Sequence, residues 1–428
     1  MKTKIIPQGY LFTRGYTNYI FILLFLLYMF DYMDRMVVTS MFVSLKEVWG
    51  ISDAQCGMLV SAVYWSIATL TIPISIFIDR WSRKKTIGLM AVIWSLATAL
   101  CALTGNFTQL LFARILIGVG EAGYAPGGTA MIASLYPNEK RSRMIGIWNA
   151  SIPLGSAVGV MLGGLIAASW GWKHAFGLVA IPGFIVAILF FYVKDYKTVD
   201  LQVTTENNNK TNMQFTDIVS YFFKRKSLIY VILGMTMVSF VTSSLMVWLP
   251  TYLQETLDIS QEKSGFKAGL VMVLAIVGAP LGGILTDRWR KRKLNARLLF
   301  PTITTGISAL LLFIGINYFS GVLQYSILLL FGTSVVAFIS AASTVTQDVV
   351  HAGLRAISYS IAVMTQNLFG SSIAPVVVGA ISDSTNIQTA FSMLPWVLVL
   401  GMFFFFLGSR HYERDFNKVE KIELEPVS

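Results

Sequence analysis

Long apolar stretches, separated by short polar segments, recur along the whole chain of 428 residues. A transmembrane helix needs about 20 apolar residues to cross the hydrocarbon core of a bilayer. The stretches lack the one-sided stripe of amphipathic surface helices, so a solenoid of helical repeats is not supported. We predict an all-α membrane protein with twelve transmembrane helices near residues 17–43, 53–78, 86–105, 108–135, 143–168, 174–193, 228–253, 265–286, 296–317, 323–348, 357–381 and 388–409.

One long polar segment interrupts this pattern in mid-chain and includes Glu206-Asn207-Asn208-Asn209-Lys210. Such a composition is typical of a linker. We therefore predict two six-helix halves that are related by pseudo-symmetry. Their bounds are 1–193 for the N-terminal half, 194–227 for a cytoplasmic linker, 228–410 for the C-terminal half and 411–428 for a cytoplasmic tail.

The halves repeat a charged block. Thr286-Asp287-Arg288-Trp289 echoes Ile78-Asp79-Arg80-Trp81, and a basic cluster follows each copy. Charge this dense cannot lie in hydrocarbon, so each block is expected to be a turn at a membrane surface. Small residues at four-residue spacing, among them Gly155 and Gly159, predict close packing of the fifth helix against a neighbour.

Composition and charge agree with a membrane protein. Hydrophobic residues make up 55% of the chain and charged residues 13%, with a mean hydropathy of +0.65; a soluble protein has about 25% charged residues. The net charge of +11 does not require nucleic acid, because 27 of the 33 Lys and Arg residues fall on one side of the predicted topology. We expect a monomer in the lipid bilayer of the cell inner membrane, with both termini cytoplasmic and the first helix retained.

Five charged residues lie inside the first and fourth predicted helices. A charge near the bilayer centre costs about 2.5–3.5 kcal/mol on insertion scales, so each is a candidate functional residue. Asp31, Asp34 and Arg35 are spaced three or four apart, which places them near one helix face. Arg114 and Glu121 are seven apart, two turns along one face of the fourth helix.

These motifs resemble those of the major facilitator superfamily. Asp79-Arg80-x-x-Arg83-Lys84 is similar to its loop motif, and Arg114-x-x-x-Gly118-x-Gly120-Glu121 to its fourth-helix motif. Tyr32-Met-Asp34-Arg35 and Gly120-Glu121-Ala122-Gly123-Tyr124 resemble both the Spinster-like branch and the organic anion:cation symporters. The resemblance implies alternating access, with the first and fourth helices as neighbours that line a central cavity. A network from Asp34 and Arg35 to Glu121 is therefore geometrically plausible.

The resemblance assigns roles to the buried charges. Asp31, Asp34, Arg35 and Glu121 are expected to couple protons to transport, because separating a carboxylate from an arginine changes its proton affinity. A static ion pair that orders the helices is the structural alternative, and direct substrate contact is a third.

The same resemblance makes the repeated block a cytoplasmic gate formed by Asp79, Arg80, Arg83, Asp287 and Arg288. The simpler alternative is that the basic residues only snorkel to the membrane surface. The second copy departs from the motif spacing through Arg290-Lys291-Arg292.

Candidate solute contacts are polar or aromatic side chains in cavity-lining helices. Arg114 suits an anionic solute, although a link to proton transfer or a structural bond to a helix carbonyl is also open. Tryptophan and tyrosine near helix ends can instead be interface anchors. The full candidate set is Arg114, Tyr32, Tyr124, Asn149, Trp248, Gln347, Gln366 and Asn367.

Other chemistries find no support in the sequence. Gly118-x-Gly120-x-x-Gly123 spells a dinucleotide motif but lies inside an apolar helix without a βαβ context. A phosphate-binding Gly-x-x-x-x-Gly-Lys-Ser/Thr segment is missing, and His174, His351 and His411 have no metal spacing. We therefore expect no cofactor, no metal and no enzymatic activity.

Together these observations predict a secondary active transporter that moves a small organic anion, such as a carboxylate, sugar acid or siderophore-like solute, with proton coupling. The alternatives are a Spinster-like carrier of lysolipids or other amphiphiles, or an exporter of small metabolites. A sensor or membrane enzyme is a different class, but no nucleophile with a nearby base is evident. The sequence does not distinguish import from export.

Overall fold

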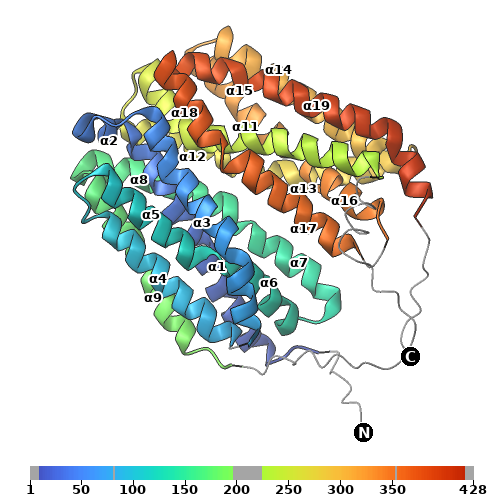
Figure 1. Ribbon diagram of the computed structural model, residues 1–428, viewed down its shortest axis with the longest axis horizontal. Coiled ribbons are helices and arrows are strands. Elements are labelled where there is room, and N and C mark those ends of the chain that lie inside the picture. The colour runs from blue at the N-terminus through green and yellow to red at the C-terminus, as the bar shows by residue number, and fades with distance from the viewer. Residues whose placement is uncertain (1–8, 81, 196–223, 352–353, 420–428) are drawn as a thin grey trace. The chain divides into compact units, whose positions relative to one another are not determined.

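The computed structural model describes residues 9–80, 82–195, 224–351 and 354–419, which are mostly helical with no strand among them (Figure 1). One short helix, η1, is of the 3₁₀ type and another, η3, is a π-helix. In chain order the helices are α1 (Arg14–Met36), η1 (Val37–Met41), α2 (Phe42–Trp49), α3 (Asp53–Arg80), α4 (Arg83–Cys101), α5 (Phe107–Glu121), α6 (Tyr124–Leu135), α7 (Asn138–Asn149), α8 (Ser151–Trp170), α9 (Trp172–Phe191), α11 (Lys226–Leu257), α12 (Gln261–Val273), α13 (Ala275–Arg290), α14 (Ala296–Asn317), α15 (Gly321–Ser334), α16 (Ile339–Asp348), α17 (Arg355–Thr365), η3 (Gln366–Ser371), α18 (Ala374–Ser384) and α19 (Ile387–Asn417).

The predicted spans are matched by helices. Within the described residues, nine helical stretches are long and apolar enough to cross a membrane, and they coincide with nine of the twelve predicted spans. The other three predicted spans fall on α1, on α3 and on the α5–α6 pair. Of these, α1 carries four charged residues and the α5–α6 pair is interrupted at Ala122-Gly123. Helix is therefore present at every predicted span.

The chain forms two compact units. The first combines residues 1–199 with 246–273 and 375–383, and the second contains 200–245, 274–374 and 384–428. Thus the end of α11, all of α12 and most of α18 belong with the first half of the sequence. The predicted division into halves stays a prediction, because the compact units run across it. Most of the predicted linker lies outside the described residues.

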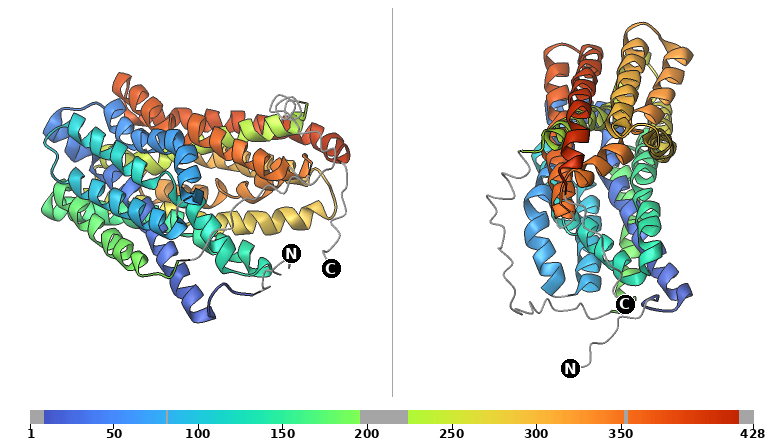
Figure 2. Two further views of the ribbon diagram at one scale, coloured as in Figure 1. Left: turned by 60° about the horizontal axis from the view of Figure 1, so that its bottom comes forward. Right: turned by 90° about the vertical axis from the view of Figure 1, so that its right-hand side faces the viewer.

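Helix packing in the first unit is close. Helix α1 packs against α8 and α9, α4 lies between α5 and α9, and α3 packs against α5 (Figures 1 and 2). A side chain at Gly155 or Gly159 of α8 would collide with the carbonyl oxygens of Met29 or Met33 on α1. The predicted close approach of the fifth helix is confirmed, and it fixes α1, which carries most of the candidate charges.

Helix ends follow local sequence signals. The Asn106 side chain accepts a hydrogen bond from the Gln109 amide at the start of α5, and Ser82 accepts one from Lys85 at the start of α4. These side chains satisfy amides that have no partner within the helix. Gly50 ends α2 with a positive φ of 61°, a conformation that favours glycine.

The second unit is built around α14, which packs along α19 and beside α15 and α16 (Figure 2). Asp348, at the end of α16, forms an ion pair with Arg297 and accepts a hydrogen bond of 2.8 Å from the Tyr412 hydroxyl. Asp415 accepts hydrogen bonds of 2.9 and 2.7 Å from the backbone amide and hydroxyl of Ser227. Helix α19 is thereby fixed to the start of α11 and continues into the predicted tail.

Candidate functional site

Three charged residues form a buried cluster in the first unit. Arg35 Nη2 lies 2.9 Å from Asp31 Oδ2, one turn earlier in α1, and Arg35 Nε lies 2.7 Å from Glu121 Oε2 at the end of α5. The second contact is ionic and lies outside hydrogen-bond geometry. The predicted proximity of Arg35 and Glu121 is confirmed. We call Asp31, Arg35 and Glu121 the Arg35 cluster.

Aromatic rings surround the Arg35 cluster. The Arg35 guanidinium carbon lies 4.5 Å from the centre of the Tyr32 ring and 5.7 Å from that of Tyr64. Within this range a ring face attracts a cation. Tyr28 stacks on Trp148 with ring centres 4.2 Å apart and also contacts Tyr32 at 5.3 Å. The cluster thus has a wall of rings on the side of α1 and α3.

Arg114 is bound differently. Its Nε donates to the carbonyl oxygen of Leu59 in α3, and Nη1 and Nη2 donate to those of Asp34 and Arg35, each at 2.9 Å. The last carbonyls of a helix have no partner within it, and α1 gives way to η1 just after these residues. Arg114 is fully buried. This geometry favours the structural alternative that the sequence left open for Arg114.

Asp34 does not join the Arg35 cluster. Both of its carboxyl oxygens are buried and have no hydrogen-bond partner among the described residues. The Thr98 hydroxyl lies beside it but donates to the Trp94 carbonyl at 3.0 Å. The expected Asp34 to Glu121 contact is therefore wrong, because Asp31 and not Asp34 is one turn from Arg35. Its role in proton coupling stays a prediction.

The other predicted solute contacts in the first unit divide by burial. Tyr124 donates to the Leu24 carbonyl at 2.5 Å and Trp248 to the Pro375 carbonyl at 3.0 Å, and both are fully buried. Tyr32 is half-buried against Arg35, and Asn149 is exposed at the end of α7. Tyr32 is the member of this group that lies against the Arg35 cluster.

In the second unit, two predicted solute contacts lie on the π-helix η3. Gln366 accepts a hydrogen bond of 3.0 Å from Ser239 and donates one of 3.1 Å to the Ala362 carbonyl. Asn367 is exposed and Gln347 of α16 is half-buried. Single π-helical turns occur frequently at functional sites, which supports Gln366 and Asn367 as candidates.

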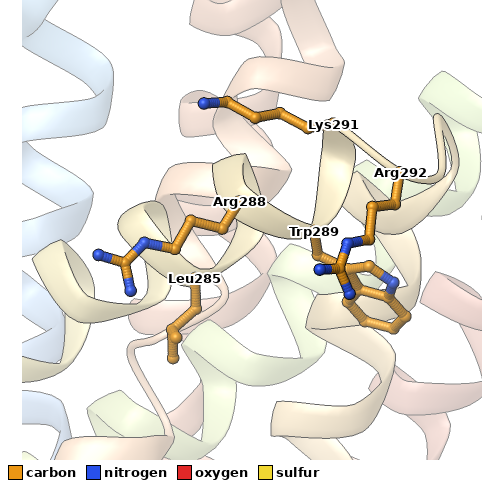
Figure 3. A pocket seen from close by; sticks show the side chains of 5 residues that line it. All are labelled: Leu285, Arg288, Trp289, Lys291 and Arg292. Atoms are coloured by element: carbon orange, nitrogen blue, oxygen red, sulfur yellow. The ribbon is translucent and has the colours of Figure 1, made fainter.

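The predicted gate is partly described. The side chains of Asp79 and Arg80 lie outside the described residues, whereas Arg83 donates to the Ser134 hydroxyl at 3.2 Å. Asp287 and Arg288 are exposed near the end of α13. A surface pocket of about 540 Å³ lies there. Its lining residues are Leu285, Arg288, Trp289, Lys291 and Arg292 (Figure 3). Its basic lining agrees with a position at the membrane surface.

Comparison with protein families decides the class. The sequence profile described as Major Facilitator Superfamily matches residues 24–374. This chain belongs to the Major Facilitator Superfamily. It is therefore a multi-pass membrane transporter of small molecules that works by alternating access, and not an enzyme.

Relatives of this facilitator include Spinster homologs and transporters of organic anions. It is 25% identical to protein spinster homolog 1 of Xenopus laevis, over 94% of this chain and 82% of the relative. It is 26% identical to the hexuronate transporter of Bacillus subtilis (strain 168), over 66% of this chain and 67% of the relative. A crystal structure of a bacterial homolog to the human lysosomal transporter Spinster, in an inward-facing and unoccupied conformation, matches with a TM-score of 0.83 at 21% identity, over 94% of this chain and 99% of that one. This likeness shows the facilitator fold.

Sequence reasoning missed part of the facilitator's site. Tyr64 contacts Arg35, and Tyr28 and Trp148 belong to the aromatic rings beside the cluster. None of the three was a sequence candidate. One signal was available, because Tyr28 precedes Tyr32 by one helical turn and shares its face. The contribution of Tyr64 from α3 depends on tertiary packing and has no local pattern.

Proposed function

We propose that this transporter couples the movement of a small organic anion to protons, and that the Arg35 cluster carries the coupling. The supporting observation is the charge balance of the cluster together with its buried neighbours Asp34 and Arg114. Three buried carboxylates, those of Asp31, Asp34 and Glu121, accompany the two buried arginines Arg35 and Arg114. One negative charge is left without a cationic counterpart. Because isolated buried charge is costly, binding one proton within this group would neutralise it.

The cluster also suits an anionic solute. Arg35 is the cation that contacts carboxylates instead of backbone carbonyls, so an incoming carboxylate can compete for its guanidinium. Neutralising Glu121 or Asp31 with a proton frees Arg35 for the solute, which links the two binding events. The similarity to a hexuronate transporter supports a sugar acid as the first solute to examine.

A screen for thermal stabilisation identifies the solute class. A ligand that binds only the folded protein raises its melting temperature, and the rise grows with the logarithm of ligand concentration over Kd. We expect stabilisation by sugar acids, or by di- and tricarboxylates or siderophores. Stabilisation by lysolipids with no response to any anion contradicts the proposed anion class.

The coupling itself is tested with Glu121→Gln in proteoliposomes loaded with the stabilising anion. The substitution keeps the size of the side chain but removes its charge and its proton site. We expect uptake driven by a pH gradient to be lost while exchange of labelled for unlabelled solute continues. Glu413→Gln, an exposed carboxylate on α19, is the matched control. Normal gradient-driven uptake by Glu121→Gln would contradict the proposed coupling role of Glu121.

A second candidate function is carriage of lysolipids or other amphiphiles. A pocket of about 440 Å³ involves α8 and α12 within the first unit. Met161, Leu162, Leu165 and Phe266 give it an apolar wall, and Lys263 and Lys267 lie at it with Glu262. An acyl chain would pack against the apolar wall, and an anionic headgroup would bind the two lysines. The lysolipid arm of the screen tests this function.

The location proposed is the cell inner membrane, with a monomer whose termini are both cytoplasmic. The sided distribution of Lys and Arg supports this orientation. Reporter domains fused to each terminus test it: a fluorescent protein that matures only in the cytoplasm is expected to be bright at both ends.

A further inference from the structure

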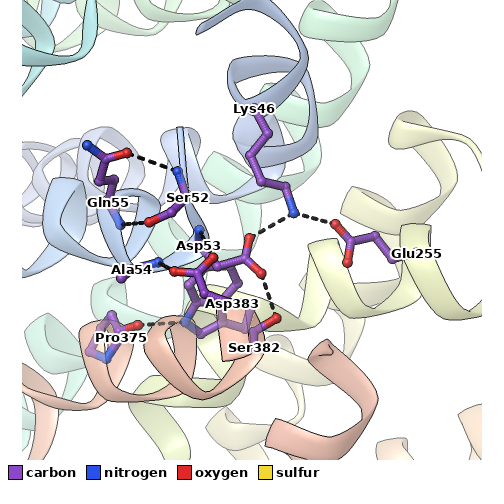
Figure 4. A network of polar contacts seen from close by, with 10 residues as sticks. Lys46, Ser52, Asp53, Ala54, Gln55, Glu255, Pro375, Ser382 and Asp383 are labelled. Carbon is purple, nitrogen blue, oxygen red and sulfur yellow. Dashed lines mark hydrogen bonds and ion pairs between the residues drawn. The ribbon is translucent and has the colours of Figure 1, made fainter. Parts of the chain in front are cut away.

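A second group of charges lies at the opposite end of α3 from its basic loop. Lys46 Nζ lies 2.8 Å from Asp53 Oδ1 and 2.5 Å from Glu255 Oε1. The Ser382 hydroxyl donates to Asp53 Oδ2 at 2.5 Å. We call Lys46, Asp53, Glu255, Ser382 and Asp383 the Lys46 latch (Figure 4). All five belong to the first compact unit.

Asp383 contributes by capping α3. Its two carboxyl oxygens accept hydrogen bonds from the backbone amides of Asp53 at 2.7 Å and Ala54 at 2.9 Å. Ser52 and Gln55 form a local capping box, in which each side chain accepts from the other's amide. The amides at the start of α3 are thus shared between a local box and a carboxylate from the end of α18. A carboxylate at this end also matches the helix dipole.

The backbones behind the latch are in close contact. A side chain at Gly57 of α3 would collide with the Pro375 carbonyl, and one at Gly379 of α18 with the Asp53 carbonyl. Trp248 of α11 donates to that Pro375 carbonyl at 3.0 Å. These segments come from the second half of the sequence, yet they pack with the first. Under the predicted division into two halves, the charges join helices that alternating access would separate.

The latch lies far from the predicted cytoplasmic gate. Helix α3 has 28 residues, and at 1.5 Å per residue it is about 42 Å long, enough to cross the membrane. Asp53 begins the helix, and the block with Asp79 and Arg80 ends it. The two charged groups are therefore expected at opposite membrane faces.

We propose that the Lys46 latch is the gate on the face opposite the basic loops, and that Lys46 is its releasing residue. Breaking its contact with Glu255 would free the end of α11 from Lys46 and Asp53 and admit solvent toward the Arg35 cluster. Lys46 is suited to this role because its side chain is 23% exposed, so water can replace its partners. The latch does not depend on which solute is carried or on proton coupling.

Cys56 is a built-in reporter of this gate. It lies one turn after Asp53, is fully buried, and is close enough to Lys46, Asp53, Glu255 and Asp383 to be influenced by their charges. The other cysteine, Cys101, is also buried, at the end of α4. Opening of the latch should expose Cys56 to a water-soluble maleimide and leave Cys101 protected.

The test compares maleimide labelling of Cys56 in lipid nanodiscs, in a Cys101→Ala background. We expect Glu255→Gln to raise the labelling rate roughly tenfold, the order expected when the closed state loses a charge-assisted hydrogen bond. Glu47→Gln, an exposed carboxylate beside Lys46, is the matched control and should leave the rate unchanged. An unchanged rate in Glu255→Gln overturns the proposal.

A charge exchange separates gating from general loosening. Lys46→Glu combined with Glu255→Lys keeps all charges and restores an opposite-charge pair between positions 46 and 255. We expect it to restore slow labelling of Cys56. Cys101, followed in a Cys56→Ala background, reports unfolding. If Glu255→Gln exposes both cysteines, the double variant distinguishes gating from unfolding. Restored protection of Cys56 in the double variant supports the latch, and continued exposure of Cys56 rejects it.

Discussion

Arg35 and Arg114 lie in the same compact unit, both are buried, and their partners differ in kind. Arg114 donates to the backbone carbonyls of Leu59, Asp34 and Arg35, whereas Arg35 contacts the carboxylates of Asp31 and Glu121. A carbonyl does not take up a proton, so the contacts of Arg114 do not respond to protonation of their acceptors. A carboxylate can be neutralised or displaced by another anion. The first arrangement fixes helices, and the second can change during a cycle.

The same contrast recurs in the Lys46 latch. Asp383 binds backbone amides at the start of α3, as Arg114 binds carbonyls at the end of α1. Lys46 binds two carboxylates, as Arg35 does. In both regions, one charged side chain is bound by backbone groups (Arg114, Asp383) and another is bound by carboxylates (Arg35, Lys46). Substitutions at the two kinds of position should have different consequences.

The largest effect is expected for Arg114→Gln. Loss of the guanidinium leaves carbonyls at the end of α1 without partners in a buried setting, a cost of about 3–5 kcal/mol. We expect little folded protein, measured as monodisperse yield in detergent and as melting temperature by circular dichroism. Arg114→Lys should recover only part of the stability, because an ammonium cannot match the fork of an arginine. A stable Arg114→Gln protein with defective transport would instead assign Arg114 a functional role.

The next effect is on transport alone. Arg35→Lys keeps the charge but cannot hold Asp31 and Glu121 with the same fixed geometry. We expect gradient-driven uptake to fall roughly tenfold or more, with stability changed by no more than about 1 kcal/mol. Uptake in proteoliposomes and thermal unfolding are measured on the same preparation. Arg414→Lys, at an exposed position of α19, serves as control. A large loss of stability would place Arg35 with Arg114 as a structural residue.

The helices could be predicted from the sequence because bilayer thickness fixes the length of an apolar run. The Arg35–Glu121 contact was predicted from the resemblance, which places the first and fourth helices together. The error at Asp34 has a geometric cause. Successive residues on a helix are about 100° apart, so Asp34 points away from its neighbour Arg35 and lies beside Thr98 of α4.

The Lys46 latch could not be read from the sequence. Lys46 meets Glu255 at a separation of 209 residues, and Asp383 caps α3 at a separation of 330. No local periodicity encodes such pairings, and charges near helix ends are common in membrane proteins for reasons of topology alone. The capping box at Ser52 and Gln55 was the available local signal, and it marks the helix start without indicating its distant partner.

A smaller effect is expected for Asp383→Asn, which tests the backbone-bound charge of the latch. The amide oxygen can still accept a hydrogen bond, but the negative charge at the start of α3 is lost. Caps of this kind contribute about 1 kcal/mol, so we expect a modest fall in melting temperature. Asp258→Asn, at an exposed carboxylate after α11, is the control. A fall as large as that of Arg114→Gln would contradict the assignment of Asp383 as a cap.

The smallest expected effect is that of alkaline pH on the latch. Burial lowers the pKa of Lys46, but its hydrogen bonds to Asp53 and Glu255 outweigh burial and hold the pKa above its ordinary value. The stability that Lys46 contributes is therefore complete below that ordinary value and is lost only as the pH rises through the still higher folded value. Between pH 7 and 9, Cys56 labelling, normalised to a free cysteine peptide, should not change. A tenfold loss of protection in that range would mean that Lys46 releases its proton there, and the latch would then respond to pH through its cation.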